Sequence, residues 1–277
     1  MSTNSLFVGI DYSGAEVPNA RLKKSQVFAA KPGGEPTLVP TPAIARAHAE
    51  GGRALHSIPR YWTRSEIAAW IVKLIQDGES ALIGIDHGFS FPDSYFKRYG
   101  LKSWDAFLGD FRRYWPTDDD NVYVDFVRDG MVWDRQPKPP GERTGGSSEF
   151  RLCERWTSSA KSVFHFVGQG SVAKSTHAGI PWLRRIRESC GDAVHFWPFD
   201  GWSPPAGKTV IAEVYTSIFR NRYQKDKRTP DEHDAYAVAR WLAESAARGS
   251  LERYFNPPLT IKEREIAGRE GWILGVS

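Results

Sequence analysis

Short apolar runs in three places predict buried β-strands. Leu6–Tyr12, Ser80–Asp86 and Lys208–Tyr215 are each about a strand in length and almost continuously apolar. Runs of this kind are typical of strands that are covered on both faces, as in the parallel part of a sheet. A further short strand is predicted near Ser25–Ala30.

Helical patterns separate and follow these runs. Thr63 and Glu66 form a capping box, and apolar residues recur at helical spacing from there to Asp77. Thr229 and Glu232 form a second capping box at the start of another amphipathic helix. Strand, helix and strand in this order indicate a βαβ unit and therefore an α/β fold.

The pattern is weaker between Pro92 and Gly207. It predicts a helix capped by Ser103, strands at Val122–Val127, Ser162–Val167 and Ala193–Trp197, a loop at Gln136–Ser148 and a helix from about Pro181 to Cys190. We expect one domain over residues 1–277, in which residues 93–207 elaborate the core.

Composition narrows the class of protein. The chain has 277 residues, of which 40% are hydrophobic and 25% charged, as in an ordinary globular protein. It has no apolar run of about 18 residues, which predicts no membrane span, and no secretory signal, so we expect a cytoplasmic protein. Two cysteines imply neither a disulfide scaffold nor a thiolate zinc site. The net charge of +4 is compatible with a nucleic-acid partner and equally with a solvated surface.

Acidic residues end the three predicted core strands. Asp11, Asp86 and Glu213 each lie at or near the end of an apolar run, and Asp231 and Asp234 lie in the first turns of the last predicted helix. If the strands lie side by side, these carboxylates converge, and clustered carboxylates repel one another unless a cation lies among them. Oxygen ligands suit Mg²⁺ or Mn²⁺. Such ions can activate water and stabilise the leaving oxygen in phosphodiester hydrolysis.

Each acid also has a structural interpretation. Asp11 and Asp86 precede small residues and could form turns, and Asp231 could complement the helix N-terminus, worth roughly 0.3–1 kcal/mol. Asp234 lies further into its helix, and Glu213 lies among apolar neighbours, where an unpaired carboxylate is costly.

Histidines adjoin two of the acids. His87 follows Asp86, and His233 precedes Asp234. Either histidine could shuttle a proton, and either could serve a structural role.

The acidic segments, taken in order, resemble the ribonuclease-H-like superfamily. The segments are Val8–Asp11 with Ser13-Gly14 after it, Ile83–Asp86, Glu213–Tyr215 and Asp231–Ala235. Within the superfamily the chain is similar to a family of predicted nucleases formerly known as a domain of unknown function. The Asp-x-x-Asp-Ala helix start is similar to the metal-binding helix of Holliday-junction resolvases.

This resemblance implies a mixed five-stranded sheet flanked by helices, with three antiparallel strands followed by parallel ones and a large insertion before the last strand and helix. It implies that Asp11, Asp86 and Asp234 hold Mg²⁺ or Mn²⁺ and hydrolyse nucleic acid. Asp231 and Glu213 would be further ligands or would orient a metal-bound water.

Two details of the resemblance concern other residues. Thr216 stands where such proteins more often have proline. The stretch Glu149–Glu154 resembles a polar segment of the family, in which Arg151 would contact a phosphate and Glu154 would be an extra ligand. Both could instead be ordinary charges on a helix surface.

Residues Gly168–Thr176 suggest a competing function. They resemble a phosphate-binding loop, although Ala173 replaces the glycine before the lysine and no strand ending in Asp follows at a suitable distance. A more modest hypothesis is that Lys174, Ser175 and His177 contact a substrate phosphate. A plain polar loop explains the same residues.

Two further alternatives remain. Gly9–Gly14 also resembles the first phosphate loop of sugar-kinase or actin-like ATPases, but the sequence lacks a second glycine-rich loop of that kind. A ribonuclease-H-like binding module without catalysis is the non-enzymatic alternative, and the presence of every acid argues against it.

Overall fold

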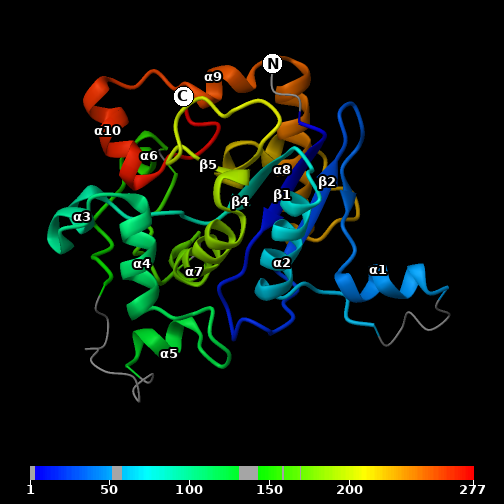
Figure 1. Cartoon of the computed structure of the whole chain (residues 1–277), viewed down its shortest axis with the longest axis horizontal. Coiled ribbons are helices and arrows are strands. Elements are labelled where there is room, and N and C mark those ends of the chain that lie inside the picture. The colour runs from blue at the N-terminus through cyan, green and yellow to red at the C-terminus, as the bar shows by residue number, and fades with distance from the viewer. Residues whose placement is uncertain (1–3, 52–57, 131–142, 158, 169) are drawn as a thin grey trace.

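A six-stranded mixed sheet forms the centre of the protein. The computed structural model describes residues 4–51, 58–130, 143–157, 159–168 and 170–277. The strands are β1 (Leu6–Asp11), β2 (Gln26–Ala30), β3 (Thr37–Leu38), β4 (Ala81–Asp86), β5 (Val194–Trp197) and β6 (Thr209–Glu213). Their order across the sheet is β3-β2-β1-β4-β6-β5, as can be followed in part in Figure 1.

The direction of the strands follows the predicted pattern. β2 is antiparallel to both of its neighbours, β1 and β3, whereas β1, β4, β6 and β5 are parallel to one another. The expected number of strands was wrong, because β5 adds a sixth strand at the edge beyond β6. The parallel strands bring the carboxyl ends of β1, β4 and β6 to one edge of the sheet.

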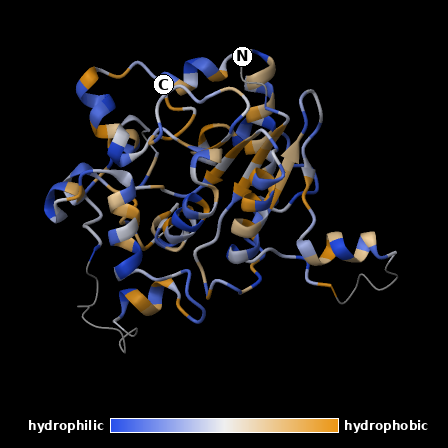
Figure 2. Ribbon diagram, in the orientation of Figure 1, coloured by the Kyte–Doolittle hydropathy of each residue, from blue (hydrophilic) through white to orange (hydrophobic). Residues whose placement is uncertain are grey.

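Helices cover both faces of the sheet. They are α1 (Pro42–Ala49), α2 (Arg64–Gln76), α3 (Asp93–Tyr99), α4 (Trp104–Tyr114), α5 (Val124–Arg128), α6 (Leu152–Trp156), α7 (Ala173–Cys190), α8 (Pro230–Ala247), α9 (Leu251–Phe255) and α10 (Ile261–Glu270). α2 and α7 share one hydrophobic core with β1 and β4, and α8 packs on the opposite face. Figure 2 shows the strands as largely hydrophobic. Burial on both faces explains the continuously apolar runs.

Two glycines let α8 lie close to the acid-bearing strands. A Cβ on Gly9 of β1 would overlap the backbone of Ala235 in α8, and a Cβ on Gly84 of β4 would meet the side chains of Val214 and Val238. Any other residue at Gly9 would therefore push α8 away from the sheet. The close approach brings the first turns of α8 up to the ends of β1 and β4.

The predicted capping signals are confirmed. Thr63 and Glu66 form a capping box at the start of α2, and Thr229 and Glu232 form one at the start of α8. The side chain of Ser103 caps α4. These are local interactions, which explains why the sequence alone predicts them well.

The middle of the chain differs from the prediction. The expected strand at Val122–Val127 is the helix α5, and Ser162–Val167 forms turns instead of a strand. α7 begins at Ala173, a little over two turns before the expected start, because Pro181 lies within the helix rather than at its beginning. The predicted loop at Gln136–Ser148 lies partly outside the described residues. Both cysteines are free.

Among the residues that the structure describes, no helix is long and apolar enough to span a membrane.

Candidate metal centre

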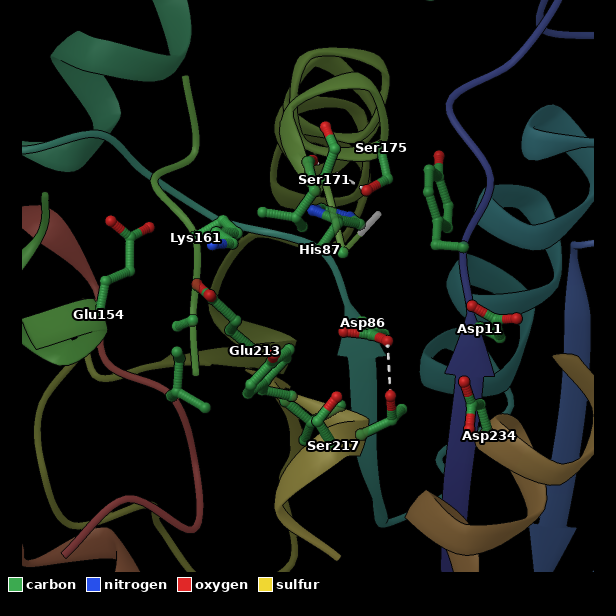
Figure 3. A pocket seen from close by; sticks show the side chains of 18 of the residues that line it. Asp11, Asp86, His87, Glu154, Lys161, Ser171, Ser175, Glu213, Ser217 and Asp234 are labelled. Carbon is green, nitrogen blue, oxygen red and sulfur yellow. Dashed lines mark hydrogen bonds between the residues drawn. The ribbon is translucent and has the colours of Figure 1, made fainter. Parts of the chain in front are cut away.

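Asp11 and Asp86 are direct neighbours at the ends of two parallel strands. They are paired in the register of β1 and β4, and adjacent strands lie about 4.8 Å apart. Asp234, from the second turn of α8, lines the same cavity, whose volume is about 290 Å³. Figure 3 shows Asp86 near the middle of this view, with Asp11 and Asp234 to its right. The fold thus brings together three of the predicted site residues.

Burial and, to a smaller extent, mutual repulsion disfavour the ionisation of these acids. Burial raises the pKa of Asp11 well above its usual value, and Asp86, Asp231 and Asp234 raise it further. Burial is also the main reason that the pKa of Asp86 is raised to about 7. The pKa of Asp234 is raised by burial, although Arg220 opposes the shift. A cation placed among these groups would relieve the cost of their ionisation.

Asp231 is more peripheral than Asp234. It is close enough to raise the pKa of Asp11, but it is not among the residues that line the cavity. Its place in the first turn of α8 suits the interaction with the helix dipole that the sequence left open. Asp234 is therefore the better-placed acid of α8.

Thr216 and Arg220 contact two of these acids. Neither residue was predicted from the sequence to belong to the site. The Thr216 hydroxyl donates to Oδ2 of Asp86 at 3.1 Å, and Nη1 of Arg220 lies 3.3 Å from Oδ2 of Asp234. The 3₁₀ segments Thr216–Ile218 and Arg220–Arg222 lie between β6 and α8. Because the segment that carries them joins two acid-bearing elements, the sequence could have indicated that they lie near the site. Thr216 thus has a contact in the site.

The donor chemistry fits a hard divalent cation. Asp11, Asp86 and Asp234 offer carboxylate oxygens, the ligands that Mg²⁺ and Mn²⁺ prefer. Within the part of the chain that the structure describes, however, no three His, Cys, Asp or Glu side chains stand together as a ready ligand set. Asp234 is oriented toward Arg220, so metal binding would require a change in that side chain.

Glu213 has a different environment from the other acids. It is 4% exposed, and its two oxygens accept from Nη1 and Nη2 of Arg151 at 2.7 and 2.6 Å. The Phe89 N–H donates to Oε2 of Glu213 at 3.0 Å. Figure 3 shows Glu213 on the far side of Asp86 from Asp11 and Asp234. Its carboxylate already has Arg151 as a partner, and its predicted place in the metal site stays a prediction.

Arg151 and Glu154 are not surface charges. Their exposed fractions are 1% and 3%, and Nε of Arg151 donates to Oε1 of Glu154 at 2.8 Å. The expectation of exposed helix charges was wrong, because the two residues complete a buried network with Glu213. A phosphate contact by Arg151 would have to displace these carboxylates.

The first turns of α7 contribute less to the site than predicted. Lys174 pairs with Asp125 at 2.6 Å, and His177 is fully buried with Nδ1 2.8 Å from the Ala173 carbonyl oxygen. Burial lowers the pKa of His177 to about 3. The predicted phosphate contact of His177 is therefore wrong, because its side chain is fully buried. The contact predicted for Lys174 stays a prediction, and Lys174 is not among the residues that line the cavity. Ser175 does line the cavity, where its hydroxyl donates to the Val172 carbonyl oxygen at 2.9 Å.

The two histidines beside the acids have structural contacts. Nδ1 of His87 lies 2.8 Å from the Gly88 carbonyl oxygen, and its ring packs against Gly179 of α7. Burial lowers the pKa of His87 to about 4. Nε2 of His233 lies 3.1 Å from the Arg220 carbonyl oxygen. These contacts favour the structural interpretation of both rings.

Basic and hydroxyl side chains complete the wall of the cavity. Lys161, Ser171 and Ser217, which are labelled in Figure 3, line it together with the acids, and so does Arg220. Lys161 is exposed, and it makes no ion pair with any described residue. The cavity therefore combines carboxylates with groups that can bind an anion.

Comparison with protein-family models, with curated proteins and with solved structures found no match to this chain.

Proposed function

We propose that this protein is a nuclease with a ribonuclease-H-like core that hydrolyses phosphodiester bonds with Mg²⁺ or Mn²⁺. The observation that carries the proposal is the register pairing of Asp11 with Asp86, with Asp234 in the same cavity. The order of antiparallel and then parallel strands supports the likeness to that superfamily. Turn-forming or capping roles do not explain why the three acids lie in one cavity. The raised pKa values of Asp11 and Asp86 show that ionising these groups costs free energy, which is unfavourable for a purely structural site.

The residues of the site divide into two chemical roles. Asp11, Asp86 and Asp234 would hold the divalent cations, which supply an activated water and charge stabilisation at the phosphate. Thr216 would orient the Asp86 carboxylate through its hydroxyl. Arg220 and Lys161 line the same cavity and carry the positive charge that a phosphodiester requires.

The phosphate-loop alternative finds less support. Such a loop joins a strand to a helix, and its lysine reaches the phosphates. Here no strand forms at Ser162–Val167, and Lys174 is paired with Asp125. An actin-like ATPase and a binding module without activity remain as outcomes that an assay can distinguish.

The test is a cleavage assay with the full chain. Labelled single-stranded and duplex DNA and RNA are incubated with Mg²⁺, Mn²⁺ or EDTA, and ATP hydrolysis is measured in parallel. We expect cleavage only with metal, and a loss of roughly 100-fold or more in Asp11→Asn, since ion-mediated charge stabilisation is worth several kcal/mol.

The matched control is Asp192→Asn, which removes an exposed carboxylate just before β5. It should cleave at the wild-type rate. Nucleic-acid binding without cleavage would favour the binding module, and metal-dependent ATP turnover without cleavage would favour the ATPase. Either result would overturn the nuclease proposal.

A further inference from the structure

Arg220 makes a contact that is easily exchanged. Its guanidinium meets Asp234 through one contact of 3.3 Å, rather than through two parallel hydrogen bonds. The Arg220 side chain is 45% exposed, and that of Asp234 is 18% exposed. By contrast, Arg151 binds Glu213 through two short contacts in full burial. A single, half-exposed ion pair is worth little and can be replaced by a stronger partner.

The backbone of Arg220 is fixed while its side chain reaches into the cavity. Nε2 of His233 lies 3.1 Å from the Arg220 carbonyl oxygen, which ties the 3₁₀ segment Arg220–Arg222 to α8. His233 is buried and directly precedes Asp234. The long side chain of Arg220 can therefore change partner without moving the segment that carries it.

Arg220 lies beside more than one acid of the site. Its side chain lines the same cavity as Asp86 and Asp234, so its guanidinium lies at the cluster that a divalent cation would occupy. A metal ion needs the Asp234 oxygens that now face Arg220. The Arg220 guanidinium and a divalent metal ion would therefore compete for the carboxylate of Asp234.

We infer that Arg220 is an exchangeable cation of the site, which pairs with Asp234 in the metal-free protein and turns to a phosphate of the nucleic acid once metal binds. The inference rests on the proposed function. The released guanidinium would lie at the wall of the cavity, a few side-chain rotations from its present position. Its planar fork matches a phosphate with two parallel hydrogen bonds.

The first measurement is calorimetric titration of the metal-free full chain with Mn²⁺. We expect Arg220→Gln to bind Mn²⁺ about three- to tenfold more tightly than the wild type, because a competing cation is removed at a partly exposed site. The matched control is Arg222→Gln, which removes an exposed arginine from the same 3₁₀ segment. It should bind Mn²⁺ as the wild type does.

The second measurement is binding of fluorescein-labelled DNA and RNA oligonucleotides with Ca²⁺ in place of Mg²⁺. Arg220→Gln should bind the oligonucleotides about fivefold more weakly than Arg222→Gln, since a charge-assisted contact is lost. Arg220→Lys should restore the wild-type affinity for Mn²⁺ but only part of the affinity for nucleic acid, because lysine lacks the fork. Tighter metal binding together with weaker nucleic-acid binding would support the exchange.

Three results would count against it. If Arg220→Gln binds Mn²⁺ no differently from Arg222→Gln, there is no competition, and if it binds Mn²⁺ more weakly, Arg220 positions Asp234 for the metal. Either result overturns the inference and leaves the proposed nuclease standing. If the wild type binds no Mn²⁺, the proposed metal site itself is overturned, and the exchange with it.

Discussion

Glu213→Gln tests whether this acid belongs to the fold or to the metal site. Its carboxylate binds Arg151 through two hydrogen bonds, and Arg151 also donates to Glu154. The side chains of Arg151, Glu213 and Glu154 are 2%, 5% and 1% exposed. Nη1 of Arg151 further reaches the Glu270 carbonyl oxygen at the end of α10 at 3.3 Å. The ion pair thus joins β6, α6 and the C-terminal helix.

The magnitude follows from this burial. Removing one partner of a buried ion pair typically costs 3–5 kcal/mol, and here Arg151 would keep Glu154 as a partner. Glutamine keeps the shape of the side chain and can still accept from the Phe89 N–H, so we expect the lower end, about 3 kcal/mol. In a protein of this size, 1 kcal/mol shifts the melting temperature by about 2–4 °C, which predicts a fall of roughly 6–12 °C.

The assay is thermal and urea unfolding of wild type, Glu213→Gln and the control Glu265→Gln in EDTA, followed by Mn²⁺ titration of the folded proteins. Glu265 is exposed on α10, and its replacement should change the free energy of unfolding by less than about 0.5 kcal/mol. We expect Glu213→Gln to be destabilised but to bind Mn²⁺ within a few-fold of the wild type. A variant as stable as the control that has lost Mn²⁺ binding would refute the reasoning and make Glu213 a ligand.

Two further predictions concern Asp86 and Lys174. The pKa of Asp86, usually 3.8, is raised to about 7 in the fold, so the folded state holds a proton that the unfolded state releases. In EDTA the free energy of unfolding of the wild type should therefore decrease by up to about 4 kcal/mol as the pH rises from about 4 to 7. Asp86→Asn should flatten this dependence. If urea unfolding gives the same pH dependence for both proteins, the prediction is contradicted. Lys174→Ala should change oligonucleotide affinity by less than about twofold, because Lys174 is not among the residues that line the cavity. A large loss in a fluorescence titration would support the phosphate contact.

The sequence predicted what local patterns determine. The apolar runs located β1, β4 and β6, because a strand covered on both faces must be apolar throughout. The capping boxes located α2 and α8, because a cap is made by residues three apart. The convergence of Asp11 and Asp86 followed from placing two such strands side by side.

The partners of the site residues could not be predicted in this way. Asp86 and Glu213 have the same sequence context, an apolar run that ends in an acid. Their environments differ because Arg151, which is 62 residues from Glu213 in the sequence, donates hydrogen bonds to Glu213 and not to Asp86. Likewise, His177 looked accessible beside the glycine-rich loop, but it lies on the buried face of a helix whose start the sequence misplaced. Pairings of this kind depend on tertiary packing, which one sequence does not encode locally.

The contrast between Glu213 and the other acids is itself an argument for a cation. At one side of the cavity the fold compensates a buried carboxylate with an arginine held by two hydrogen bonds. At the other side Gly9 lets α8 approach, so that Asp234 is added to two carboxylates that already repel each other. The described contacts there are one hydroxyl and one half-exposed arginine. A scaffold would gain stability by replacing these acids. The arrangement becomes favourable when a divalent cation binds the folded state, which should then be stabilised in proportion to the logarithm of the cation concentration.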